Sequence, residues 1–234
     1  MRIAVTGTNG VGKSTFINDM LQQWSCFSKP ETDFRSKIQK RYTTTVNSKR
    51  QKKILKLMTD QLRTYGKGDN VIYDRCPIDN MVYTLYGYAK EHGITDKFVK
   101  QTAEELKKAL RMIDLVLFIP VTKHDSVCIE DNLEDKGDLT EEYAIEIDNI
   151  FKSLYKEWDK RGSPYVDFED KPHVLEIFGT PEERIEMVKL YIDVVGDAYG
   201  EGNIIAPDEL EGLHNMSELL TQQEEEVKES KYNL

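Results

Sequence analysis

The feature that most restricts how this 234-residue chain folds is an eight-residue run near its start, GTNGVGKS at positions 7–14. It matches the pattern G-x-x-x-x-G-K-[ST] at every fixed position. A β-prone segment, residues 3–6, precedes the run, and an amphipathic helical pattern that includes Phe16, Ile17 and Met20 follows it. In such a strand, loop and helix the loop amides and the helix N-terminus converge on one anion. The sequence therefore predicts a phosphate-binding loop.

The residue types in this loop fit a nucleoside triphosphate and its metal ion. Glycines at three positions let the backbone approach phosphate oxygens closely. We expect the Lys13 ammonium to contact the β- and γ-phosphates and the Ser14 hydroxyl to ligate Mg²⁺. The sequence thus predicts ATP and Mg²⁺ as cofactors, bound by Gly7, Asn9, Gly10, Val11, Gly12, Lys13, Ser14 and Thr15.

A second set of candidate residues follows the apolar segment 71–73, where the sequence reads DRCPID at positions 74–79. A carboxylate at the carboxyl end of a parallel strand lies in the crevice where such sheets bind ligands. Asp74 is therefore a candidate to hold Mg²⁺ or to accept a proton from a substrate hydroxyl, and Arg75 offers forked donors to a phosphate. The structural alternative is that Asp74 caps the next helix and Arg75 forms a surface ion pair.

Hydrophobic periodicity predicts an α/β fold in which strands alternate with helices up to about residue 195. The predicted strands are residues 3–6, 70–74, 115–120 and 173–178, with a weaker one at 25–28. We expect a three-layer fold with a parallel sheet of about five strands, forming one domain over residues 1–195. Residues 196–234 are rich in acids and poor in apolar side chains, which predicts a poorly ordered tail.

Several classes of protein are disfavoured by composition. The longest apolar runs are about a third of the roughly 20 residues that cross a bilayer, and the start of the chain lacks a signal-peptide pattern. We therefore expect neither a membrane span nor a secretory signal. Cys26, Cys76 and Cys128 are widely spaced, which argues against a disulfide framework or structural zinc and favours the cytoplasm.

Taken together, the loop at 7–14 and Asp74-Arg75 at the end of the next core strand resemble one branch of the P-loop superfamily. That branch is the nucleoside and nucleotide kinases, with deoxynucleoside kinases, thymidylate kinase and AAA_28-type nicotinamide-riboside-kinase-like proteins. The resemblance covers about residues 1–195. It implies that the strand ending at Asp74 lies beside the P-loop strand. It also implies transfer of the ATP γ-phosphate to a nucleoside, a nucleotide or a polynucleotide end.

The resemblance also implies roles for residues outside the two motifs. Members carry an acidic residue after their second strand that positions or deprotonates the acceptor, and Glu31 occupies that place, with Asp33 in reserve. A plain exposed loop is the alternative there. Thr180 and Pro181 follow the last strand as the adenine-side loop of these kinases does, although a bare strand-to-helix turn has the same sequence pattern.

One region departs from the kinase pattern. Related kinases cover the phosphates with a lid that bears arginines, whereas this chain has no arginine between Arg111 and Arg161. Residues 123–148 are instead crowded with acids. Either Lys136 takes the lid role, or Arg75 and a residue of the basic segment 35–67 supply the positive charge.

Charge is distributed unevenly along the chain, whose net charge is −10. Residues 35–67 carry a local charge of +10, and residues 197–234 carry −8. The basic segment lies where this kinase branch builds its acceptor site. A small nucleoside does not need so many cations. A polynucleotide acceptor would bind more tightly with them, because it releases counterions when cations neutralise its phosphates. A solvated helix face is the structural alternative.

These observations leave three functions open. The first is an ATP- and Mg²⁺-dependent kinase acting on a free nucleoside or nucleotide. The second is a kinase whose acceptor lies in a polynucleotide, such as a hydroxymethylated base in phage DNA or a 5′ end. The third is a nucleotide-switched binding module that hydrolyses ATP slowly. We favour the free acceptor, because the acidic lid stretch and tail would repel a long polyanion.

Overall fold

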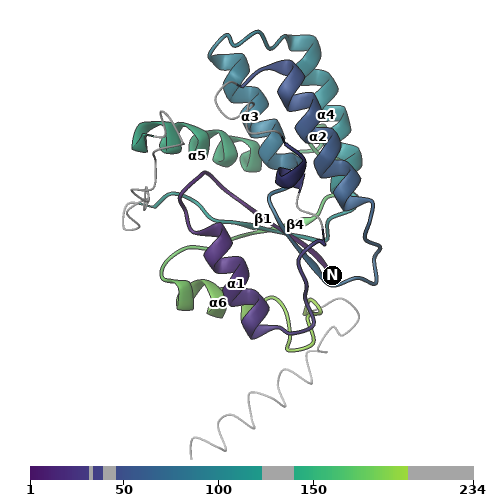
Figure 1. Cartoon of the computed structure of the whole chain (residues 1–234), viewed down its shortest axis with the longest axis vertical. Helices are drawn as coiled ribbons and strands as arrows, with labels where there is room; N and C mark the ends of the chain where they lie inside the picture. Colours follow the sequence, from purple (N-terminus) through teal and green to yellow (C-terminus); the bar gives the residue numbers. More distant parts are fainter. Residues whose placement is uncertain (32–33, 39–45, 123–139, 200–234) are drawn as a thin grey trace, which may run out of the picture. The chain divides into compact units, whose positions relative to one another are not determined.

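The computed structural model describes residues 1–31, 34–38, 46–122 and 140–199, and the centre of that part is a parallel sheet of four strands. From one edge to the other, the strands lie in the order β2, β1, β3, β4 (Figure 1). Their bounds are Arg2–Thr6 for β1, Val71–Asp74 for β2, Leu115–Phe118 for β3 and His173–Glu176 for β4. As the resemblance implied, β2 pairs with the P-loop strand β1.

Helices connect the strands and cover both faces of the sheet (Figure 1). The α-helices are α1 (Lys13–Gln23), α2 (Ser48–Leu62), α3 (Pro77–Ala89), α4 (Asp96–Leu110), α5 (Glu141–Lys156) and α6 (Pro181–Lys189), and Phe34–Lys37 forms a short 3₁₀ helix. The predicted three-layer α/β fold is confirmed.

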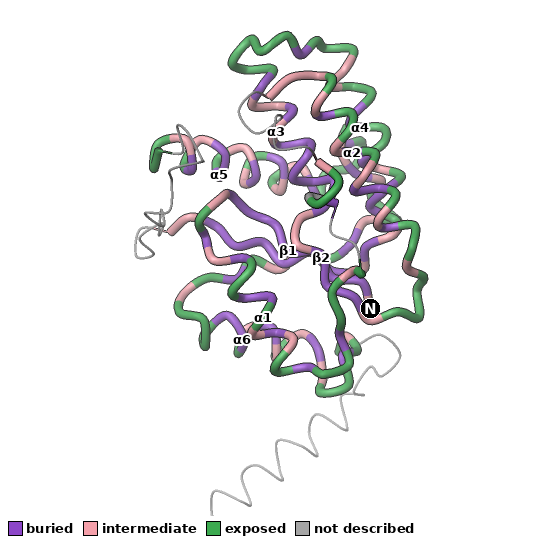
Figure 2. Tube along the Cα trace, in the orientation of Figure 1, coloured by how far each residue is buried: buried purple, intermediate pink, exposed green. Residues whose placement is uncertain are grey.

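Alternation along β1 shows how the strands divide the core into two layers. Because successive strand side chains point to opposite faces, Ile3 and Val5 pack with α1 and α6, while Ala4 packs with α3, α4 and α5. Figure 2 shows β1 and β2 largely in purple, and β3 is also buried, whereas the edge strand β4 is only partly buried. The three buried strands read as nearly continuous apolar runs, which is typical of a parallel sheet covered on both sides.

The register of the sheet sets the position of the site. Val5 of β1 lies opposite Asp74 of β2, and Thr6 lies opposite Phe118 of β3. The Arg75 N–H donates to the Val5 carbonyl at 3.0 Å, so the chain leaves β2 beside the end of β1. The loop after β1 and the residues after β2 consequently meet at the same edge of the sheet.

The weak strand predicted at residues 25–28 is the main difference between sequence and structure. Only Ser28 pairs, through a single parallel bridge to Val71 on the free side of β2. Pro30 follows two residues later and lacks an N–H to continue a ladder. The described sheet thus has four strands and a bridge where about five strands were expected.

Some predicted features lie outside the described residues. They are Asp33, Cys128, the lid candidate Lys136 with most of its stretch, and the acidic tail from residue 200 onward. The chain divides into two units, Met1–Gly196 and Asp197–Leu234. Within the described part, no helix combines the length and apolar character that crossing a membrane requires.

Candidate active site

The loop between β1 and α1 has a backbone that its glycines make possible. Gly7 has a φ of 139°, and a Cβ at this position would lie 2.5 Å from the Ile119 carbonyl oxygen. Gly12 caps α1 with a φ of 83° in the left-handed region. Because glycine carries no side chain, it offers no capping group to the first amides of α1. These amides are the donors that a helix N-terminus presents to an anion.

Polar groups buried in this loop fit a bound polyphosphate. The Lys13 side chain is only 6% exposed, and its ammonium donates to the Thr8 carbonyl oxygen. The Thr8 hydroxyl is also buried and makes no hydrogen bond within the described residues. Burying an ammonium and a hydroxyl in this way is costly unless a strong acceptor compensates them. The residues present therefore fit the phosphates of ATP.

Ser14 and Asp74, predicted separately as metal ligands, are in direct contact. The Ser14 hydroxyl donates to Asp74 Oδ2 at 3.1 Å, which joins the first turn of α1 to the end of β2. A hydroxyl and a carboxylate beside a phosphate loop are the oxygen ligands that Mg²⁺ takes, together with water and substrate phosphates. No group of three or more His, Cys, Asp or Glu side chains forms a metal cage in the described part of the chain. A magnesium ion at Ser14 and Asp74 would thus depend on the nucleotide for further ligands.

The alternative that Asp74 caps the next helix is wrong. Asp74 is the last residue of β2, and α3 begins three residues later at Pro77 with Cys76 as its N-cap. The capping carboxylate is that of Asp79, which accepts the Cys76 N–H at 3.0 Å. Asp74 is therefore not used for capping and lies at the phosphate loop.

Arg75 joins the two motifs, and its predicted surface ion pair is in fact buried. Its guanidinium donates to Asp79 Oδ1 at 3.0 Å, to the Gly7 carbonyl at 3.4 Å and to Asn9 Oδ1. The side chains of the pair are only 11% and 1% exposed. Arg75 also has a φ of 77°, which is uncommon for a residue other than glycine and is often found at functional sites.

Burial and neighbouring charge act in opposite directions on this pair. Burial acts to lower the pKa of Arg75, but Tyr83 and Asp79 outweigh it and raise that pKa above its ordinary value. Burial raises the pKa of Asp79, although Arg75 and the Cys76 N–H oppose the change. The guanidinium is thus a permanent positive charge beside the phosphate loop.

Replacing Asp79 by Ala is expected to destabilise the protein strongly. The change removes the cap of α3 and leaves Arg75 buried without its carboxylate, a loss of about 3–5 kcal/mol in the free energy of unfolding. Urea denaturation measures this. The control is Asp60→Ala, which breaks the exposed pair with Arg63 and should cost about 1 kcal/mol or less. Equal stability of the two variants would contradict the role given to Asp79.

Thr180 and Pro181 begin α6, and this helix reaches the phosphate loop. The Thr180 hydroxyl accepts the Glu183 N–H at 3.3 Å, and Pro181 occupies the first turn. Arg184, one turn later, is 9% exposed and donates to the Val11 carbonyl at 3.0 Å. Arg184 is not among the site residues predicted from the sequence. The available signal was its place beside Ile185 on the apolar face of the helix.

A second polar cluster, also missed from the sequence, lies between α2 and α3. Asn80 and Gln51 are both buried, and the Asn80 amide donates to the backbone and side-chain oxygens of Gln51 at 3.0 and 2.7 Å. Asn80 Oδ1 has no hydrogen-bond partner among the described residues. Tyr83 lies one turn further along α3, and the Arg75 guanidinium lies over its ring, with 5.8 Å between Arg75 Cζ and the ring centroid. Asn80 therefore lies on the same helix as a residue that contacts Arg75.

Two predicted site residues lie apart from these contacts. Glu31 is exposed, and its N–H donates to the Tyr65 hydroxyl at 3.0 Å. No described hydrogen bond or ion pair joins its carboxylate to the loop. Thr15 is exposed in the first turn of α1. The roles of both residues stay predictions.

The strand, glycine-rich loop and helix at the start of the chain define a P-loop protein. The sequence model of the family AAA_28, an AAA domain, matches residues 2–172, and the chain belongs to that family. No curated protein matches the chain significantly.

Solved structures show the same fold at low sequence identity. Deoxyadenosine kinase from M. mycoides with bound dCTP matches with a TM-score of 0.59 and 18% identity, over 80% of this chain and 96% of that one. NadR protein in complex with NR matches with a TM-score of 0.54 and 16% identity, over 85% of this chain and 53% of that one.

Proposed function

We propose that this chain is an ATP- and Mg²⁺-dependent phosphotransferase that moves the γ-phosphate of ATP to a nucleoside or nucleotide. The observation that carries the proposal is the 3.1 Å hydrogen bond between Ser14 and Asp74. It places an oxygen-ligand pair at the start of the P-loop helix, next to the buried Lys13. A loop with this arrangement is suited to a nucleotide whose γ-phosphate is transferred.

The side chains would act by positioning and by electrostatics. Lys13 and the loop amides would hold the phosphates, and Ser14 and Asp74 would hold Mg²⁺. When bound, the metal neutralises charge on the phosphate oxygens. Arg75, fixed by Asp79, keeps a positive charge at the loop throughout the reaction. Such preorganised charges stabilise a phosphoryl group in transfer more than they stabilise the ground state.

The cluster between α2 and α3 supports a nucleoside or nucleotide acceptor. The edge of a nucleobase carries both hydrogen-bond donors and hydrogen-bond acceptors. Asn80 Oδ1 is a buried hydrogen-bond acceptor without a partner in the described part of the chain. A substrate with an amino or imino group could donate a hydrogen bond to that oxygen and would therefore be favoured. Glu31 or Asp74 would take the proton of the acceptor hydroxyl.

The proposal is tested by measuring ADP release with and without candidate acceptors. We expect release to be slow with ATP and Mg²⁺ alone and to rise at least about 100-fold with the correct nucleoside or nucleotide. Such an increase is within the range that acceptor positioning contributes. A rate that no acceptor changes, combined with nucleotide-dependent binding of a partner, would favour the binding module instead.

The second candidate function, a kinase acting on a polynucleotide, is favoured by one surface. Lys49, Lys52, Lys53 and Lys56 are exposed on α2. Arg50, also in the basic segment, is not part of this surface because it is half-buried, and burial lowers its pKa. A row of exposed lysines along one helix suits contact with successive phosphates.

Changing these four lysines to Gln separates the two acceptors. If the acceptor is a free nucleotide, the variant should show at most a modest rise in acceptor KM, because few of the lysines can reach one phosphate. If it is a polynucleotide, binding should weaken, and its log-log salt slope on duplex DNA should fall by up to about 0.9 per lost contact. The charge-matched control changes four exposed lysines elsewhere, Lys97, Lys100, Lys108 and Lys160, to Gln. We expect the modest rise in acceptor KM that a free nucleotide predicts. A steep salt dependence that only the α2 variant loses would establish a polynucleotide acceptor.

A further inference from the structure

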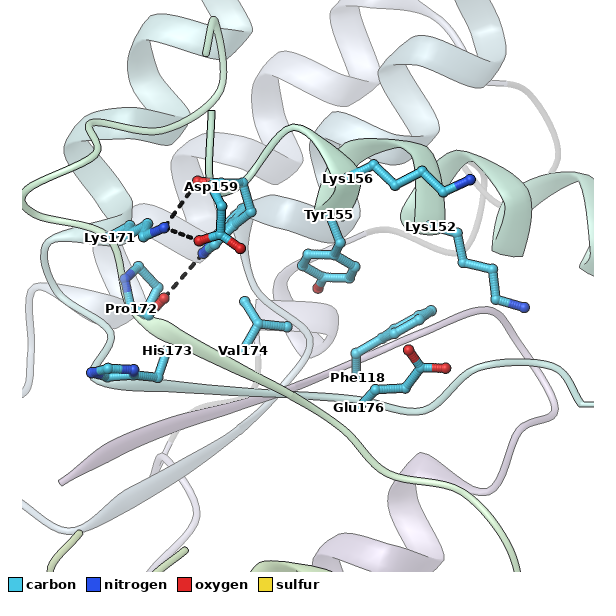
Figure 3. Close-up of a pocket in the computed structure, with 11 residues that line it drawn as sticks. Phe118, Lys152, Tyr155, Lys156, Asp159, Lys171, Pro172, His173, Val174 and Glu176 are labelled. Atoms are coloured by element: carbon cyan, nitrogen blue, oxygen red, sulfur yellow. Dashed lines mark hydrogen bonds and ion pairs between the residues drawn. The ribbon is translucent and has the colours of Figure 1, made fainter. Parts of the chain in front are cut away.

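A cavity of about 620 Å³ lies between α5 and β4, on the sheet face opposite the P-loop helix (Figure 3). Its volume is within the range of small-molecule sites. Nothing in the phosphotransfer mechanism uses it. Apolar side chains line it together with lysines and two carboxylates. The lining includes Phe118, Tyr155, Trp158, Lys152, Lys156 and Glu176.

The apolar part of the cavity is aromatic and held in place. The ring centroids of Phe118 and Tyr155 are 4.9 Å apart, and those of Tyr155 and Trp158 are 5.5 Å apart. Trp158 Nε1 donates to the Pro172 carbonyl at 3.1 Å, and the Tyr155 hydroxyl lies 2.8 Å from Thr6 Oγ1. Rings fixed in this way are suited to contact with a planar aromatic ligand.

The charged part of the cavity includes two lysines that lie one turn apart on α5, Lys152 and Lys156. Lys152 is held by Asp148 at 2.6 Å and by the Val121 carbonyl at 3.2 Å. Lys156 is exposed and forms no ion pair within the described residues. In Figure 3 both lysines extend at the same end of the cavity, where Glu176 also lies. An anion at this end would be bound by two ammonium groups, and Glu176 would accept hydrogen bonds from hydroxyl or amino groups.

We propose that this cavity binds a small aromatic anion of the nucleotide class, at a site separate from the P-loop. Its phosphate contacts Lys152 and Lys156, its ring lies against Tyr155 and Trp158, and Glu176 accepts from its hydroxyl or amino groups. The ligand class follows from the combination of aromatic rings, two ammonium groups and one carboxylate that accepts hydrogen bonds. Inorganic phosphate would contact only the charged groups, and a neutral nucleoside would not use the two ammonium groups.

Trp158 provides a local readout, because the chain has only two tryptophans. The probe is AMP, titrated while tryptophan emission is recorded, with adenosine and inorganic phosphate as separate arms. We expect a saturable change with AMP, and binding at least about tenfold weaker with either fragment. The change should persist in Trp24→Phe and disappear in Trp158→Phe.

Three further variants test where the probe binds. Lys156→Gln should raise the Kd for AMP about tenfold, since it removes a charge-assisted hydrogen bond. Lys160→Gln, which alters an exposed lysine near the end of the same helix, should leave the Kd unchanged. Binding should also persist in Lys13→Ala, in which the phosphate loop is impaired. The proposal is overturned by an absent response to AMP, by an equal Kd in Lys156→Gln, or by loss of the response in Lys13→Ala.

Discussion

Replacing Lys13 by Ala is expected to abolish phosphoryl transfer while leaving the fold intact. The change deletes the ammonium that neutralises the transferring phosphoryl group, and Lys13 belongs to neither hydrophobic core. Loss of such preorganised charge costs about 10³-fold or more in kcat. The measurement is transfer rate at saturating ATP, with circular dichroism and the melting temperature as tests of folding.

A matched control for this prediction is Lys29→Ala. Lys29 is exposed and donates to Asn18 Oδ1 at 2.6 Å. The control variant therefore removes a lysine that is close to α1 but outside the loop. Its transfer rate should stay within about twofold of the unaltered protein, as for most surface changes. Near-normal turnover in a folded Lys13→Ala protein would mean that the loop is not the phosphate site.

Replacing Asp74 by Asn is expected to lower kcat by about 10³-fold with little effect on ATP affinity. Asparagine keeps an oxygen that can accept the Ser14 hydroxyl, so the local packing is preserved while the charge is lost. If the carboxylate organises Mg²⁺ or the acceptor hydroxyl, its loss acts mainly on the transition state. The KM for ATP and kcat, measured over a range of Mg²⁺ concentrations, separate these effects.

Asp114→Asn is the control for Asp74→Asn. Asp114 forms an ion pair with Arg2 at 2.7 Å at the other end of the sheet. Burial acts to raise the pKa of Asp114, but the hydrogen bonds from Arg2 outweigh it and lower that pKa. This variant should lose stability and keep its turnover per folded molecule. A lower melting temperature with normal turnover in Asp74→Asn would make that carboxylate structural.

Much of the fold was predictable because its signals are local. The runs that became β1, β2 and β3 are almost entirely buried, so their hydrophobicity is nearly continuous. The ends of all four strands agree with the predicted ones within about two residues. The strand predicted at residues 25–28 was wrong because pairing with β2 depends on tertiary structure. A single bridge at Ser28 leaves no periodic pattern that could be distinguished from a loop.

The site was predictable to the extent that sequence spacing alone determines it. The P-loop could be read directly, and Asp74 was placed at the right edge of the sheet. Its contact with Ser14 depends on the register between β1 and β2, which no local pattern encodes. Arg184 and Asn80 come from α6 and α3, and only the packing of these helices shows that one contacts the loop and the other leaves a buried acceptor.

The most direct test of the central claim follows the label itself. The intact protein is incubated with γ-labelled ATP, Mg²⁺ and a panel of nucleosides, nucleotides, DNA and RNA, and the products are separated. We expect the label to move to one or a few free nucleosides or nucleotides, and the transfer to disappear in Lys13→Ala. Label found only as inorganic phosphate, at a rate that no acceptor changes, would contradict the proposed phosphotransferase activity.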